Sequence, residues 1–187
     1  MTQPEDLARI ASEEQERQGC IKHCLGVCIA AGCLSSHSDA VKGALDAEVK
    51  AKGREGEIEV RPVGCMGLCS AGPLVQELRT GTLYQHAQPA DAADIVASLE
   101  AKPVSRLLCP TDQPFFARQH KIVLENSGQI NPHRIEDYIA ADGYTALLDA
   151  LTTMTPAEVI QQVVKSGLRG RGGGGYPTGL KWSTVAK

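Results

Sequence analysis

Residues 63–73 read VGCMGLCSAGP and carry two cysteines, Cys65 and Cys69, with three residues between them. This stretch follows residues 57–61, EIEVR, in which polar and apolar side chains alternate as they do in a half-buried strand. Glycines and small residues around thiolates let backbone N–H groups approach sulfur, and hydrogen bonds of this kind tune iron–sulfur clusters. The stretch therefore predicts one half of a metal centre at the end of a strand.

A second cysteine pair lies earlier in the chain, in residues 27–33, VCIAAGC. Cys28 and Cys33 have four residues between them and follow a strand expected at residues 21–27. Both pairs thus follow strands and can lie at one end of one sheet, so we interpret the four thiols as ligands of a 2Fe-2S cluster. Four thiolates would also hold zinc, although zinc sites more often show CxxC spacing in polar, basic surroundings. A pair of disulfides is the third alternative and the least favoured.

The composition is typical of a protein of the cell interior. The chain has 187 residues, of which 42% are hydrophobic, with a formal net charge of −3 and seven cysteines. An odd number of cysteines without a secretory signal favours metal ligation over a disulfide framework. The polar, acidic start is not a signal peptide, and no run approaches the roughly 18 apolar residues of a membrane span. We expect a cytoplasmic protein without a membrane span, and its charge indicates no nucleic-acid partner.

Helix and strand signals alternate through the first half of the chain. The sequence predicts a helix over residues 7–19, a helix over residues 38–53 with Ser38 as N-cap, a hairpin over residues 74–84 and a closing helix over residues 91–99. This order resembles that of the thioredoxin-like 2Fe-2S ferredoxin domain, whose cysteines stand as CxxxxC and then as CxxxC within GCxGxCxxGP. The resemblance implies an α/β fold and four cluster ligands, which are Cys28, Cys33, Cys65 and Cys69.

The other three cysteines lie outside this pattern. We interpret Cys20 and Cys24 as strand or core residues, because free cysteine is commonly buried. Cys109 lies in a connector that contains several prolines, residues 102–118, and we expect no ligand role for it.

A different unit is expected after the connector. Residues 120–126 are predicted to form an edge strand, and residues 135–139 and 144–151 to form helices. Thr155 begins a capping box with proline at the first helical position, and the helix that it opens ends at Gly167.

Residues 167–182 read GLRGRGGGGYPTGLKW and are the second chemical signal of the chain. Their glycines can present backbone N–H groups, and Arg169, Arg171 and Lys181 add positive charge, a combination that suits phosphate groups. Residues 170–175 satisfy GxGxxG, but the loop follows a helix rather than a strand, so an ordinary dinucleotide-binding fingerprint is rejected. A flexible glycine-rich linker is the alternative, and the cationic and aromatic side chains argue against it.

The stretch from residue 166 to residue 182 resembles SGLRGRGGAGFPTGLKW, the signature of the flavin subunit of respiratory complex I and its soluble relatives. Gly174 replaces alanine and Tyr176 replaces phenylalanine, and neither change removes a charge or a backbone donor. The resemblance implies that the loop binds FMN and shapes an NADH pocket. The residues that it implicates by position are Gly170, Arg171, Gly172, Gly173 and Lys181, with Tyr176 as a contact to NAD(H).

A ferredoxin domain ahead of such a loop resembles the diaphorase flavin subunit of NAD-reducing bidirectional NiFe hydrogenases. We therefore expect a thioredoxin-like 2Fe-2S domain at residues 1–101, a connector at residues 102–118, and the N-terminal part of an FMN- and NADH-binding α/β domain at residues 119–187. The chain looks like the front part of a larger flavoprotein, or a split subunit that another chain completes.

The two resemblances together imply an NADH/NAD+ oxidoreductase, a diaphorase, that passes electrons between nicotinamide, FMN and iron–sulfur clusters. Its expected partners are NADH and the other diaphorase and hydrogenase subunits, and no single residue of the chain is predicted to be catalytic. Similar fusions occur in NAD-dependent formate dehydrogenases, so the flavin subunit of such an enzyme or of complex I is an alternative. The alternative of another class is a non-catalytic 2Fe-2S electron carrier or docking module.

Overall fold

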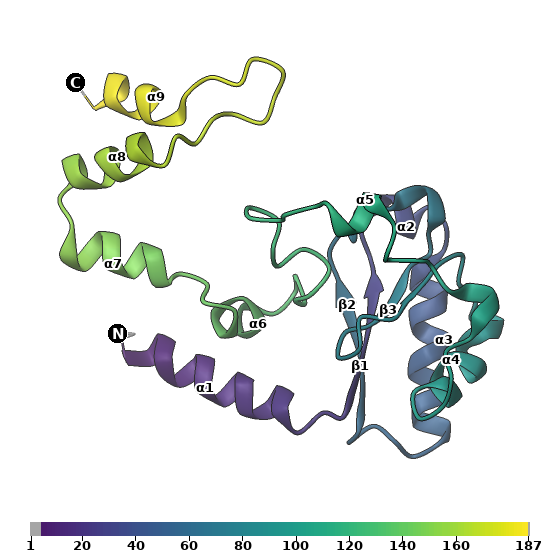
Figure 1. Cartoon of the computed structure of the whole chain (residues 1–187). Helices are drawn as coiled ribbons and strands as arrows, with labels where there is room; N and C mark the ends of the chain where they lie inside the picture. Colours follow the sequence, from purple (N-terminus) through teal and green to yellow (C-terminus); the bar gives the residue numbers. More distant parts are fainter. Residues whose placement is uncertain (1–4, 187) are drawn as a thin grey trace. The chain divides into compact units, whose positions relative to one another are not determined.

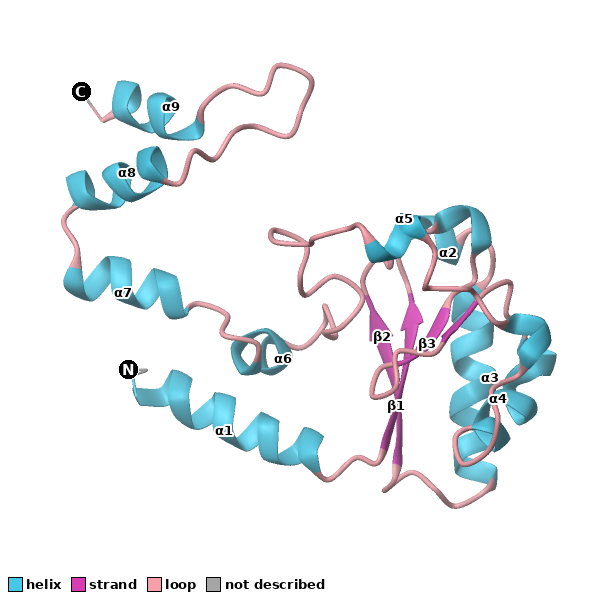
Figure 2. Cartoon of the chain, viewed as in Figure 1, coloured by secondary structure: helices cyan, strands magenta, loops and turns pink. Residues whose placement is uncertain are grey.

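The computed structural model describes residues 5–186. These residues divide into two compact units, Glu5–Ala141 and a second unit that begins at Asp142. Within the described residues, the strands belong to the first unit, and helices joined by loops make up the second (Figure 1, Figure 2). No helix in this part of the chain combines the length and the apolar character needed to cross a membrane.

A four-stranded mixed sheet forms the centre of the first unit, with the strand order β2-β1-β3-β4. Its strands are β1 (His23–Cys28), β2 (Ile58–Val63), β3 (Val75–Glu77) and β4 (Leu83–Tyr84). β1 pairs in parallel with β2, and the β3–β4 hairpin extends the sheet on the other side of β1 through antiparallel pairs. The expected strands before both cysteine pairs and the expected hairpin are confirmed.

Helices surround this sheet. Those of the first unit are α1 (Glu5–Gly19), α2 (Ala31–Leu34), α3 (Ser38–Ala51), α4 (Ala92–Ser98), α5 (Pro114–Ala117) and α6 (Ile135–Ala140), with short 3-10 helices at Cys69–Ala71, Pro89–Asp91 and Ser105–Leu107. α3 connects the parallel strands β1 and β2, as a parallel pair requires, and it packs with α4 on one face of the sheet (Figure 1).

The apolar core lies between that face and the two helices. Side chains two apart in a strand share a face, so Leu25 and Val27 of β1 both point into the core. Val41, Leu45 and Val49 of α3 recur every four residues and form the matching stripe. All five side chains are buried. The sequence pattern of these elements therefore accounts for the main core.

The opposite face of the sheet carries charged side chains. Glu59 and Arg61 of β2 point to this face, where Arg61 is buried and donates two hydrogen bonds to the Glu59 carboxylate. Arg17 of α1 donates to Glu59 over 3.3 Å, and Asp137 of α6 lies 3.7 Å from Arg61. Burying a charge is costly unless it is paired. The pairing explains how α1 and α6 can cover a face that contains buried charges.

α1 and α6 also bind each other directly. Arg134 donates to the carboxylate of Glu14 over 2.9 Å, and Gln15 donates to the carbonyl of Ala140 over 2.9 Å. Segments about 120 positions apart in the sequence thus pack in one unit, which extends to Ala141. The domain boundaries expected at residues 101 and 119 stay predictions.

Two local expectations are wrong. Residues 120–126 form turns rather than an edge strand, and their Ile122, Val123 and Leu124 side chains are exposed. Apolar residues alone do not make a strand, because the backbone also needs a neighbouring strand to pair with. The N-cap of α3 is His37, in a left-handed conformation, instead of Ser38. Ser38 is buried, and its hydroxyl has no hydrogen-bond partner in the described residues.

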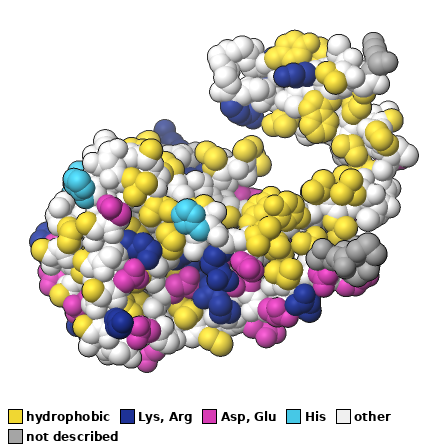
Figure 3. Space-filling model, turned by 180° about the vertical axis from the view of Figure 1, so that it is seen from behind, with side chains coloured by type: hydrophobic (Ala, Val, Ile, Leu, Met, Phe, Trp, Pro, Cys, Tyr) yellow, Lys and Arg dark blue, Asp and Glu magenta, His cyan; other side chains and the backbone are white. Residues whose placement is uncertain are grey.

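The second unit contains α7 (Thr145–Thr153), α8 (Pro156–Lys165) and α9 (Thr178–Val185). The predicted capping box is confirmed, since the Thr155 hydroxyl accepts from the Glu158 backbone and the Glu158 carboxylate accepts from the Thr155 backbone. α8 and α9 approach closely at Gly179, where a Cβ would lie 2.6 Å from Cα of Val164. Hydrophobic side chains cover much of the visible face of this unit (Figure 3); the exposed ones include Leu147, Leu151, Val164, Leu180, Trp182 and Val185.

Candidate metal centre and glycine-rich loop

The parallel pairing of β1 and β2 brings the two cysteine pairs to the same end of the sheet. Cys28, the last residue of β1, stands opposite Val63, the last residue of β2. Just beyond the strands, the amide of Ile29 donates to the Val63 carbonyl over 2.9 Å. The segments that follow β1 and β2 therefore leave the sheet side by side. Cys65 follows two residues later. The expectation that both pairs lie at one end of one sheet is confirmed.

Cys28 and Cys33 form the inner pair, and each is only 1% exposed. The short helix α2 turns the chain back after β1 and places Cys33 near Cys28. Burial, followed by a hydrogen bond shared with Cys28, raises the pKa of Cys33 to about 12. Such a thiol keeps its proton in the metal-free chain, and a bound metal would have to displace that proton. In the metal-free chain Cys33 is therefore an unreactive buried thiol.

Cys65 and Cys69 form the outer pair, in which Cys65 is partly exposed and Cys69 is exposed. Their sulfur atoms lie 4.0 Å apart, and the amide of Gly67 donates to Cys65 Sγ over 3.3 Å. The hydrogen bond with Cys65 and then the charge of Cys65 raise the pKa of Cys69. Two thiols this close favour a shared cation, because a cation relieves the repulsion between the two thiolates.

Two glycines allow the inner and outer pairs to approach each other. A Cβ on Gly32 would lie 3.2 Å from Cys69 Sγ, and a Cβ on Gly72 would lie 2.9 Å from Cys33 Sγ. A side chain at either position would push the pairs apart. Sequence reasoning did not single out these glycines as site residues, although Gly32 precedes Cys33 and Gly72 belongs to the GCxGxCxxGP pattern.

The arrangement of the thiols fits a two-iron centre. A 2Fe-2S cluster takes one pair of thiolate ligands for each iron, and Cys28/Cys33 and Cys65/Cys69 supply two such pairs. Structural zinc takes four ligands around one ion, for which four thiolates also suffice.

The residues predicted to bind FMN and NADH lie together in the loop between α8 and α9 and in the first turn of α9. The amide of Gly170 donates to the Tyr176 carbonyl over 2.9 Å, and this bond closes the loop. The Arg169 side chain donates to the carbonyl of Gly175 over 2.7 Å, while Arg171 donates to the carbonyl of Arg169 over 3.1 Å. Arg169 thus stabilises the loop through hydrogen bonds of its side chain and its carbonyl to other loop residues.

At the tip of the loop, residues 172–174 are exposed. No atom lies within 4 Å of a Cβ built on Gly172, Gly173 or Gly174, so packing in this unit does not require these glycines. In the part of the chain that the structure describes, the amides of these three residues have no hydrogen-bond partner. Tyr176 and Lys181 are exposed as well. Free backbone amides fit an anionic ligand such as a phosphate group.

Residues 14–100 match the thioredoxin-like 2Fe-2S ferredoxin family. The first unit contains a thioredoxin-like 2Fe-2S ferredoxin domain. The α/β fold expected for the ferredoxin domain is therefore confirmed. A solved thioredoxin-like 2Fe-2S ferredoxin from Aquifex aeolicus is 25% identical and covers 48% of this chain and 98% of its own, with a TM-score of 0.45.

Curated relatives support the expected resemblance to the flavin subunits. The NADP-reducing hydrogenase subunit HndC of Solidesulfovibrio fructosivorans is 57% identical over 65 residues, which are 35% of this chain and 13% of that protein. An NADH-quinone oxidoreductase subunit of Rhizobium meliloti is 47% identical over 66 residues, which are 35% of this chain and 16% of that protein. The match thus spans about a sixth or less of the relatives' length.

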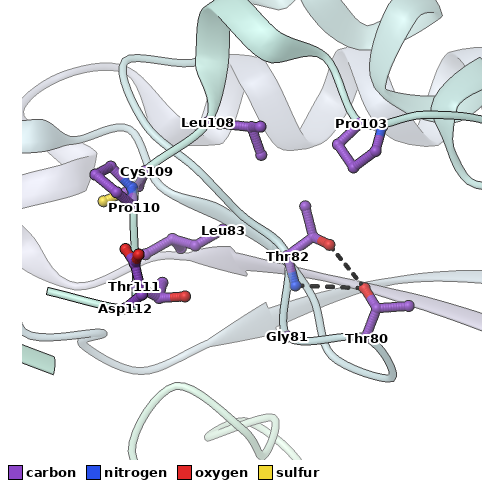
Figure 4. A pocket seen from close by; sticks show the side chains of 10 residues that line it. All are labelled: Thr80, Gly81, Thr82, Leu83, Pro103, Leu108, Cys109, Pro110, Thr111 and Asp112. Atoms are coloured by element: carbon purple, nitrogen blue, oxygen red, sulfur yellow. Dashed lines mark hydrogen bonds between the residues drawn. The ribbon is translucent and has the colours of Figure 1, made fainter. Parts of the chain in front are cut away.

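The remaining cysteines take different places around the ferredoxin domain. Cys24 is buried in β1, as expected, whereas Cys20 is exposed after α1, so its interpretation as a strand or core residue is wrong. Cys109 is buried in the same apolar cluster as Cys28 and Cys33. It also lines a cavity of about 430 Å³ between the β3–β4 hairpin and the connector. Figure 4 shows its sulfur on the side away from the hydrogen-bonded Thr80 and Thr82.

Proposed function

We propose that Cys28, Cys33, Cys65 and Cys69 hold a 2Fe-2S cluster in a protein that exchanges electrons with NADH through FMN, as the diaphorase component of an NAD-linked hydrogenase. The single observation that carries the cluster assignment is the close approach of each cysteine pair to the other's segment, with Gly32 lying against Cys69 and Gly72 against Cys33. When bound, FMN accepts a hydride as an electron pair, and an iron–sulfur cluster carries one electron at a time.

The protein's own residues have distinct tasks in this proposal. The inner cysteines would hold one iron of the cluster and the outer cysteines the other, and the cluster would carry single electrons. The amides of Gly172 and Gly173 would bind phosphate oxygens of FMN or NADH. Arg171 and Lys181 add fixed positive charge, which a backbone nest lacks because it offers only partial charges.

The choice of a hydrogenase rests on two supports. A ferredoxin domain ahead of the glycine-rich loop resembles the diaphorase subunit of NAD-reducing hydrogenases, and the relative with 57% identity over 65 residues is a hydrogenase subunit. The relatives that are NADH-quinone oxidoreductase subunits favour a complex I type of flavin protein as the second candidate. In both candidates the partners are the other subunits of a multi-subunit oxidoreductase.

Flavin binding by the natural protein tests the role of the loop. We expect Arg171→Ala to weaken FMN or NADH binding by about 1.5–3 kcal/mol, the value of a hydrogen bond to a charged group. Lys165→Ala, a change at the end of α8 outside the loop, is the matched control and should leave binding unchanged. The 2Fe-2S absorbance should be equal in both variants. Unaltered flavin content and NADH oxidation in both Arg171→Ala and Lys181→Ala would instead favour an electron-carrier or docking module.

A further inference from the structure

Residues 127 and 128 touch the loop that carries the outer cysteine pair. The hydroxyl of Ser127 donates to the backbone carbonyl of Cys65 over 2.7 Å. Gly128 has a left-handed φ of 82°, and a Cβ there would lie 3.1 Å from Cγ of Met66. A Cβ on Gly64 would lie 3.9 Å from the Ser127 hydroxyl oxygen. The two segments therefore lie against each other, with the Met66 side chain packed on Gly128.

The same segment is anchored to β2 and α1 a few residues later. Arg61 of β2 donates to the Gln129 carbonyl over 3.4 Å, and Asp137 accepts from the amide of Asn131 over 2.9 Å. Arg134 donates to Asp137 over 3.3 Å and to Glu14 over 2.9 Å. Because β2 runs directly into the outer cysteine loop, the segment is tied to the strand at one end and to the loop at the other.

The two cysteine pairs differ in how they are supported. The inner pair is fully buried, between the end of β1 and α2. In the outer pair Cys65 is partly exposed and Cys69 is exposed, and the loop contains Gly64 and Gly67, the latter with a left-handed φ of 91°. Glycine has more conformational freedom than other residues, so such a loop needs outside contacts to keep one shape.

We propose that residues 127–137, the clamp, hold the outer cysteine loop in its ligand geometry, with Ser127 as the positioning residue for Cys65. The clamp lies outside residues 14–100, the part that matches the ferredoxin family. This inference rests on the proposed 2Fe-2S site. It predicts that loosening the clamp exposes the outer iron to solvent and chelators without preventing cluster assembly.

The test uses the full chain with a reconstituted cluster. Two readouts are taken, the rate of iron release to an excess of a strong chelator and the EPR spectrum of the reduced cluster. Ser127→Ala should release iron about fivefold faster, the factor that corresponds to a hydrogen bond of about 1 kcal/mol. Its EPR spectrum should also change. The carbonyl of Cys65 loses its hydrogen bond from Ser127, and Cys65 can then shift relative to the iron that it binds. Ser127→Thr, which keeps the hydroxyl, should restore both readouts.

Ser35→Ala is the matched control. The Ser35 hydroxyl donates to the Ala31 carbonyl over 2.8 Å within the segment that carries Cys33, and its loss leaves the outer loop untouched. Both readouts should equal those of the wild type. Equal release rates and equal EPR spectra in Ser127→Ala and the wild type would overturn the clamp, while the proposed cluster would stand. A wild-type chain that assembles no 2Fe-2S cluster would overturn both.

Discussion

The two units of the chain bury their side chains very differently. In the ferredoxin unit, both faces of the sheet are covered, one by apolar residues of α3 and α4 and the other by ion pairs to α1 and α6. In the second unit, no apolar side chain of α7 or α8 is buried. Large exposed apolar patches mark interaction surfaces. The candidate metal centre therefore lies in a unit whose sheet is covered on both faces, whereas the glycine-rich loop follows helices whose apolar side chains are not buried.

The largest effect should come from the buried carboxylate that joins α6 to the sheet. Asp137 is 1% exposed and pairs with both Arg61 and Arg134. Asp137→Ala leaves buried Arg61 with less compensation, so we expect the ferredoxin unit to lose about 3–5 kcal/mol of unfolding free energy. Urea unfolding followed by circular dichroism measures it. Glu136, in the same helix, is partly exposed and lies 3.9 Å from Arg134, so Glu136→Ala should cost less than about 1 kcal/mol. Equal effects would show that α6 does not belong to this unit.

A pair of leucine truncations compares the two units directly. Leu45 is fully buried in the core, while Leu151 of α7 is exposed. We expect Leu45→Ala to lower the unfolding free energy by about 2–5 kcal/mol, because it removes apolar contacts and leaves a cavity. Leu151→Ala should change it by less than about 0.5 kcal/mol. A comparable loss in both variants, measured by the same urea titration, would contradict the difference in burial.

The smallest effect concerns pH. Burial by itself would raise the pKa of Glu14, but hydrogen bonds from Arg17 and Gln18 outweigh it and lower that pKa from 4.5 to about 2. The stabilisation by ionised Glu14 is therefore complete above about pH 4.5 and is lost as the pH falls toward 2. Glu14→Gln should be less stable than the wild type by about 1–2 kcal/mol at pH 7, and the difference should shrink by pH 3.

Urea titrations across this pH range measure the difference. Glu16→Gln, an exposed change on the same helix, should show no such trend. A gap between Glu14→Gln and the wild type that stays constant from pH 7 to pH 3 would mean that the charge of Glu14 does not stabilise the unit.

The predictable parts of the fold depend on local patterns. Residues that alternate or recur every four positions specify β1, β2 and α3, and the Thr155 capping box specifies the start of α8. The cysteine pairs were found because their ligand spacing is local as well. Their close approach at Gly32 and Gly72 depends on the parallel pairing of two strands, which the spacing within each pair does not encode.

The parts that sequence reasoning missed depend on distant contacts. Ser127 and Cys65 are 62 positions apart, and Glu14 and Arg134 are 120 positions apart. No local pattern marks a serine as the partner of a particular carbonyl. The run Ile122-Val123-Leu124 has strand character, but it finds no strand to pair with and stays exposed in turns. Contacts between residues far apart in the sequence therefore determine both the position of the clamp and the absence of a strand at residues 120–126.

Metal and sulfide analysis of the full chain, purified without oxygen, tests whether the four thiols bind a 2Fe-2S cluster. We expect about two iron atoms and two acid-labile sulfides per chain, bound by four cysteines. Cys65→Ala should abolish the cluster absorbance, and Cys20→Ala, which removes an exposed cysteine outside the site, should retain it. Stoichiometric zinc without iron in the wild-type chain, or a full cluster in Cys65→Ala, would contradict the account.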